Sequence, residues 1–109
     1  MNGVQVQLVG RTAGAVAWVD EADLDLIARH RWRLLKPSRS LTAYAVTSIE
    51  GRTVLMHRLI MGDANGTVID HIDGNGLNNR RQNLRHVTQG ENVRAGVARR
   101  AFDRYQDLL

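Results

Sequence analysis

The residues with the clearest chemical potential lie between positions 70 and 92. Asp70 and His71 are neighbours, Asn83 follows His71 after 12 residues, and Asn92 follows Asn83 after 9. A carboxylate beside an imidazole offers a metal ligand and a general base. The amide oxygen of Asn92 would join Asp70 as a second hard oxygen ligand, which suits Mg²⁺ or Mn²⁺ better than zinc. The pattern is compatible with one divalent cation and a histidine base, and a basic α+β domain with a polar loop is the alternative.

The elements that must position these side chains are two short strands, the turn-rich loop between them and a following helix. In chain order they are Thr67–His71, Asp73–Asn79, Leu84–Val87 and a capping box at Thr88-Gln89-Gly90-Glu91. Neighbours in a strand point to opposite faces, so Asp70 and His71 can share a site only if the strand ends or bends there. We expect Asn83 to brace the loop and to hold the His71 ring by a hydrogen bond.

The first 56 residues show the patterns of a small antiparallel sheet with one helix. Alternating apolar residues from Val4 to Leu8 and a second run at Val16–Val19 predict a hairpin. Asp20 is expected to cap a short helix over Glu21–Ala28. Three further strands and a short helix ended by Gly62 follow at Trp32–Leu35, Ala43–Thr47, Thr53–Met56 and His57–Met61. Trp32 is expected in the core.

Length and composition exclude several classes of protein. The chain of 109 residues, with 43% hydrophobic residues, suits one globular domain. It has no cysteine, which excludes disulfides, thiol catalysis and cysteine-based zinc sites. No apolar run approaches the length of a membrane helix, and the N-terminus does not resemble a signal peptide. We expect no membrane partner and a reducing cytoplasm.

Charge gives the first indication of a partner. The 15 basic residues outnumber the 11 acidic ones, for a net charge of +4, and Lys36 is the only lysine. The segment from Arg80 to Arg104 contains seven arginines and two acidic residues, which gives it a net charge of +5. Such a stretch favours nucleic-acid binding, and a solvated helix face is the alternative. A GC-rich genome is an alternative source of the arginine excess. The expected DNA contacts are Arg58, Arg80, Arg81, Arg85 and Arg99.

The motifs together resemble the HNH endonucleases, a branch of the ββα-metal nucleases. The resemblance runs from His57 to about Arg94 and is closest to the homing-endonuclease branch of phages and mobile introns. It rests on four segments: Met56-His57-Arg58-Leu59, Asp70-His71-Ile72-Asp73-Gly74-Asn75, Asn78-Asn79-Arg80-Arg81-Gln82-Asn83-Leu84, and Thr88 with Asn92. The three family letters fall on His71, Asn83 and Asn92.

The resemblance implies an α+β fold in which a β-rich part, residues 1–56, precedes an HNH motif, residues 57–109, that ends in a C-terminal helix. It implies a metal-dependent DNA endonuclease that nicks one strand or cuts both. His71 would be the general base, Asp70 and Asn92 would hold one Mg²⁺ or Mn²⁺ ion, and Asn83 would fix the loop. His57 recurs in the opening of the family pattern, and we expect it to pack or hydrogen-bond beneath the site, with metal ligation as the alternative. The expected location is the cytoplasm of a bacterial host cell, with a phage or mobile element as the source.

Two questions stay open at the level of the sequence. A non-catalytic or accessory DNA-binding protein with an HNH fold, for example in a phage packaging or regulatory complex, is the alternative function. The last helix carries an apolar stripe: Val93, Val97, Ala101, Tyr105 and Leu109. This stripe must be buried, either on the N-terminal sheet of a monomer or between the two copies of a homodimer.

Overall fold

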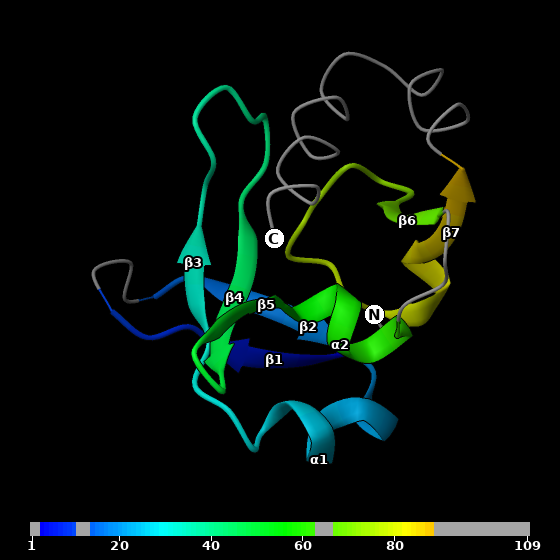
Figure 1. Ribbon diagram of the computed structural model, residues 1–109. Coiled ribbons are helices and arrows are strands. Elements are labelled where there is room, and N and C mark those ends of the chain that lie inside the picture. Colours follow the sequence, from blue (N-terminus) through cyan, green and yellow to red (C-terminus); the bar gives the residue numbers. More distant parts are fainter. Residues whose placement is uncertain (1–2, 11–13, 63–66, 89–109) are drawn as a thin grey trace.

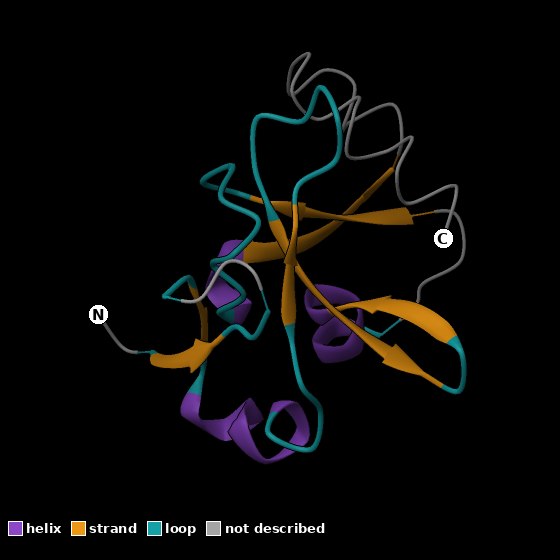
Figure 2. Cartoon of the chain, turned by 90° about the vertical axis from the view of Figure 1, so that its left-hand side faces the viewer, coloured by secondary structure: helices purple, strands orange, loops and turns teal. Residues whose placement is uncertain are grey.

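The computed structural model describes residues 3–10, 14–62 and 67–88. In these ranges, strands outnumber helices, and the helices are short (Figures 1 and 2). The elements in chain order are β1 (Val4–Gln7), β2 (Val16–Val19), the 3-10 helix η1 (Glu21–Asp23), α1 (Leu24–Ile27), β3 (Arg33–Leu35), β4 (Tyr44–Ile49), β5 (Arg52–Leu55), α2 (Met56–Met61), β6 (Thr67–His71), the 3-10 helix η2 (Arg81–Asn83) and β7 (Leu84–Thr88). The expected α+β class is confirmed for this part of the chain.

The strands form three antiparallel sheets with the orders β1-β2, β3-β4-β5 and β6-β7. The expectation of one sheet within residues 1–56 is wrong, because the five strands there divide into two sheets. A parallel bridge between Val9 and Arg33 links the end of the first hairpin to β3. Alternation of apolar residues identifies a strand, but it does not say which neighbour the strand will pair with.

One apolar cluster connects elements from both halves of the chain. Leu8, Val19, Trp32, Met56 and Ile69 are among its buried members. The indole Nε1 of Trp32 donates a hydrogen bond of 2.8 Å to the carbonyl oxygen of Ile27, which places the expected core tryptophan against the end of α1. Burial of this apolar surface is the main force that fixes the sheets relative to one another.

Asp20 occupies the N-cap position of η1, as the sequence predicts, but its side chain does not cap the helix. The predicted helix is a 3-10 turn followed by four α-helical residues, and the Asp20 side chain makes no capping hydrogen bond. Its Oδ2 instead accepts a hydrogen bond of 2.9 Å from the backbone N–H of Arg81. The carboxylate therefore joins η1 to η2, 61 residues further along the chain.

The loop of residues 72–80, here called the motif loop, lies against the N-terminal half. The backbone of Trp18 donates to Leu77 and accepts from Asn79, at 2.8 and 2.7 Å. Gly76 donates a hydrogen bond of 2.8 Å to the Thr42 hydroxyl. The predicted loop is thus held by the sheets that precede it.

The C-terminal helix that the sequence predicts, with its apolar stripe, lies outside the described residues. In the described ranges, no helix is long and apolar enough to cross a membrane.

Candidate active site

The β6-β7 pair sets the positions of the two central side chains. Its register places Asp70 opposite Arg85 and His71 opposite Leu84. Strand β6 ends at His71, and the backbone then turns, with a hydrogen bond from the N–H of Gly74 to the His71 carbonyl. Because neighbouring side chains on a strand alternate between its faces, the two residues meet different surroundings.

His71 is buried among polar and aromatic groups. The residue is only 5% exposed, and the Nε2 atom of its ring lies 2.8 Å from Oδ1 of Asn79. The centroid of the ring lies 4.6 Å from that of His57, with the planes at 76°, and 6.0 Å from that of Tyr44. The imidazole is thereby held on three sides by β4, α2 and the motif loop.

His57 lies beneath His71, as the sequence predicts, at the first turn of α2. It is completely buried. Burial lowers the pKa of His57 well below 6.5, and the nearby charges of His71 and Arg58 lower it further. His57 is therefore neutral near pH 7 and places no positive charge beside the His71 ring.

Asp70 is paired with a cation of its own chain. The residue is 2% exposed, and its Oδ2 accepts a hydrogen bond of 2.9 Å from Nε of Arg85, the residue opposite it in the sheet. The Arg85 side chain is 52% exposed and that of Asp70 is 3% exposed, so the arginine covers a buried carboxylate from the solvent side. The residue expected to hold metal and the residue expected to touch phosphate are thus in direct contact.

Of the two expected metal ligands, the described one is Asp70. Its carboxylate is a hard oxygen ligand, which suits a divalent cation. Asn92 lies outside the described residues. Within the described ranges, no cluster of three or more His, Cys, Asp or Glu side chains could hold a metal. The expected set includes only one carboxylate, so it would not form such a cluster.

Asn83 braces the motif loop through both ends of its amide. Its Nδ2 donates to Oδ1 of Asp73 and to the carbonyl of Asn78, each at 2.9 Å, and its Oδ1 accepts from the backbone N–H of Asp73 at 3.0 Å. Partial burial raises the pKa of Asp73, but hydrogen bonds from Asn78, Asn75 and Asn83, with the nearby His71, bring it below 3.8. These contacts match the loop-bracing role expected for Asn83.

The hydrogen-bond partner of the His71 ring is Asn79, whose Oδ1 is the acceptor; the sequence indicated no role for this loop residue. The hydrogen bonds of the Asn83 side chain go to Asp73 and Asn78. The hydrogen bond expected between Asn83 and the His71 ring is therefore replaced by one between Asn79 and the ring. Asn79 is fully buried, and within the described ranges its Nδ2 has no hydrogen-bond partner. The paired asparagines at 78 and 79 were the available signal, but asparagines in loops usually indicate turns.

The expected DNA-binding arginines have different surroundings. Arg81 binds both carboxylate oxygens of Asp23, with its shortest contact at 2.9 Å, and also donates to the Ile60 carbonyl. Hydrogen bonding to Asp23 raises the pKa of the Arg81 guanidinium. Arg80 donates from Nε to Asn78 at 2.9 Å. Arg58 lies on α2 at the edge of a groove of about 390 Å³ that β5 also lines. Arg99 lies outside the described residues.

Two of these arginines therefore tie the molecule together. Arg81 connects η2 to η1, and its side chain is 55% exposed while that of Asp23 is 8% exposed. Arg85 neutralises Asp70. In each case, a carboxylate of the chain already takes the place that a phosphate group would occupy.

Residues 54–94 match the family model described as HNH endonuclease, which confirms the resemblance to the HNH endonucleases but does not test the homing-endonuclease branch. The match begins at the end of β5 and spans α2, the β6-β7 pair and the motif loop. No curated protein and no solved structure matched the chain.

Proposed function

We propose that this chain, whose residues 54–94 match the HNH endonuclease family model, is a metal-dependent DNA endonuclease. The family implies DNA as the substrate and phosphodiester hydrolysis as the reaction. The observation that carries the proposal is the placement of His71 at the end of β6, held by Asn79 and packed on a neutral His57.

In this proposal, His71 acts as the general base. It takes a proton from a water molecule as the water oxygen attacks the phosphorus atom. The bond to the 3′ oxygen breaks, that oxygen leaves with the electron pair and takes up a proton, and the products are a 5′-phosphate and a 3′-hydroxyl. An imidazole suits this proton transfer near neutral pH. Asn79 would hold the ring in one orientation, so that little rearrangement is needed before the attack.

Asp70 and Asn92 are the residues that would hold one Mg²⁺ or Mn²⁺ ion. When bound, a divalent cation neutralises charge on the phosphate group and stabilises the departing 3′ oxygen. Asn83 would act at a distance from the reacting atoms, because its bonds fix the shape of the motif loop. Arg85 would compete with the cation for Asp70 or share the carboxylate with it.

Incubation with supercoiled plasmid tests the proposal directly. We expect nicked or linear DNA in the presence of Mg²⁺ or Mn²⁺ and no product in EDTA, because the expected metal ligands are hard oxygens that suit these cations. Product that persists unchanged in EDTA would contradict the metal-dependent mechanism. The ratio of nicked circle to linear product at early times separates one-strand from two-strand cleavage.

One observation favours the alternative function. The Asp70 carboxylate is already paired with Arg85, and such a pair suits a site that binds DNA without cutting it. A non-catalytic or accessory DNA-binding protein, acting for example in a phage packaging or regulatory complex, would bind the plasmid and leave it intact with every divalent cation tested.

A further inference from the structure

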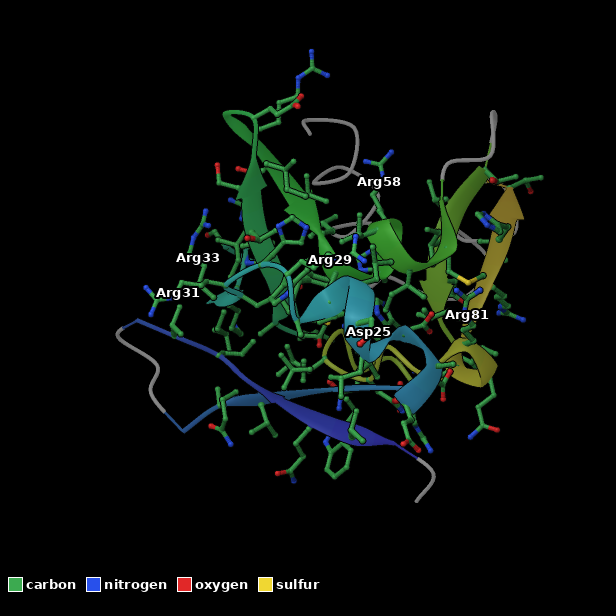
Figure 3. All side chains as sticks on the ribbon, turned by 90° about the horizontal axis from the view of Figure 1, so that it is seen from below. Asp25, Arg29, Arg31, Arg33, Arg58 and Arg81 are labelled. Atoms are coloured by element: carbon green, nitrogen blue, oxygen red, sulfur yellow. The ribbon has the colours of Figure 1, made fainter. Side chains whose placement is uncertain are left out.

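A run of positive charge lies outside residues 54–94, in the N-terminal half of the chain. Residues 26–49 contain five basic side chains and no acidic one: Arg29, Arg31, Arg33, Lys36 and Arg39. In the described ranges, the ion pairs join Arg81 to Asp23 and Arg85 to Asp70, and none involves these five. Figure 3 shows Arg31 and Arg33 pointing outward on the opposite side of the molecule from Arg81.

The end of this basic stretch is the connection between β3 and β4. Residues 36–43, here called the hairpin finger, project beyond the other described elements in Figures 1 and 2. Lys36 and Arg39 are exposed, and Leu41 is 81% exposed, the highest value among the large apolar side chains described. Leu41 follows the two cations closely in the chain, and a leucine so exposed to water has no packing role within the described structure.

The finger is held in shape by its own hydrogen bonds. The backbone N–H of Ser40 donates to the Pro37 carbonyl at 3.0 Å, and the Ser40 hydroxyl donates to the Thr42 carbonyl at 2.8 Å. Arg39 occupies the left-handed region, with φ of 69°. These bonds present the Lys36, Arg39 and Leu41 side chains from an ordered turn, which lowers the entropy lost on binding.

The base of the finger touches the candidate active site. Thr42 accepts the hydrogen bond from Gly76 of the motif loop at 2.8 Å, and the next residue but one, Tyr44, has its ring centroid 6.0 Å from that of His71. A ligand held by the finger would therefore be held beside His71.

We propose that the hairpin finger is a DNA-docking element, in which Lys36 and Arg39 bind phosphates and Leu41 is inserted against a base step. This inference rests on the proposed function, since it assigns the docking surface for the same substrate. Lysine and arginine side chains bind the phosphate groups of the DNA backbone. An apolar side chain on a cationic loop can insert between two stacked bases.

The test is DNA binding measured in EDTA, where no cleavage is expected. A labelled 30-base-pair duplex is titrated with the full chain by fluorescence anisotropy at several salt concentrations. The test variant is Lys36→Gln with Arg39→Asn, because asparagine tolerates the left-handed backbone at position 39. The matched control is Arg29→Gln with Arg52→Gln, which removes the same charge from two exposed positions outside the finger.

Loss of two phosphate contacts should lower the slope of log affinity against log salt by about 1.8, at roughly 0.9 for each contact, while the control keeps the slope of the wild type. Leu41→Ser should keep that slope and weaken binding by about 10-fold, because it removes one buried leucine from the complex. With 2-aminopurine in the duplex, the wild type should raise the fluorescence through unstacking, and Leu41→Ser should not.

Equal slopes for the finger variant and the control would overturn this inference while leaving the proposed function intact. Unchanged affinity and unchanged 2-aminopurine signal in Leu41→Ser would likewise remove the insertion of Leu41. A wild-type protein that binds no DNA at all would contradict both proposals. Circular dichroism of each variant checks that the chain has folded.

Discussion

His57 and His71 show how one residue type takes two roles from its surroundings. His57 is fully buried at the start of α2, and burial, with the charges of His71 and Arg58, keeps its pKa well below 6.5. His71 lies at a strand end, where a polar partner and the turn of the backbone hold its ring. The neutral histidine supplies packing, whereas the other is the candidate base.

The lowered pKa of His57 predicts acid sensitivity. As the pH falls below 6.5, the unfolded chain binds a proton at this position before the folded chain does, so protonation favours unfolding. The free energy of unfolding should therefore fall by up to about 1.4 kcal/mol per pH unit from this group, between pH 6.5 and the lower pKa of the folded state.

Urea denaturation at several pH values, with His57→Gln as the comparison, measures this contribution. The variant should show a flatter dependence in that window. NMR gives an independent reading that needs no variant: the ring signals of His57 should stay constant across pH 6.5. A midpoint near 6.5 for those signals would contradict the account.

At this scale, the sequence predicted the contacts of Asn83 with the loop and the place of His57 beneath the site. The first follows from the place of Asn83 just before the second strand, and the second from the family resemblance of the segment that contains His57. Asn79 was missed, because a loop asparagine can turn its amide toward solvent, backbone or a side chain, and spacing does not distinguish these. The pairing of Asp70 with Arg85 was also missed, since it depends on the register of β6 against β7.

Gly76 lies where the motif loop packs closely against the β3-β4 hairpin. A Cβ atom at this position would lie 2.3 Å from the Ala43 carbonyl oxygen and 2.5 Å from Cδ1 of Tyr44. Both distances are well inside van der Waals contact, and the first partner is backbone. The loop can approach the hairpin only because residue 76 has no side chain.

Gly76→Ala should therefore destabilise the fold by roughly 1–3 kcal/mol and displace Tyr44, which lies beside both histidines. Gly74→Ala is the matched control: it also lies in the motif loop, with φ of 79°, but nothing stands within 4 Å of the added Cβ. It should cost only the backbone strain, about 1 kcal/mol. Equal urea midpoints for the two variants would show that the close approach does not matter.

The elements themselves were largely predictable from periodicity. Strands β1, β2, β6 and β7 and the short helix α2 fall within one or two residues of the expected ranges. The predictions that were wrong concern which groups and which strands pair with one another. Asp20 follows the pattern of a helix cap, yet Arg81 supplies a competing donor from far along the chain. The five N-terminal strands form two sheets, because pairing is decided by tertiary packing.

The distribution of charge over the whole molecule differs from its distribution along the sequence. The stretch from Arg80 onward has the highest count of arginines, but Arg81 and Arg85 are engaged by Asp23 and Asp70. The basic side chains of residues 26–49 have no such partners in the described part of the structure. A net charge counted along the chain cannot show which cations are neutralised, and this is why the hairpin finger emerges only from the structure.

His71 is the proposed general base for DNA cleavage, and the variant His71→Ala removes it. The measurement is single-turnover cleavage of supercoiled plasmid with Mg²⁺, alongside DNA binding by anisotropy in EDTA. We predict a loss of roughly 100-fold or more in cleavage rate with nearly unchanged affinity, because a general base acts in the transition state. A variant that cuts DNA at a rate close to that of the wild type would contradict the account.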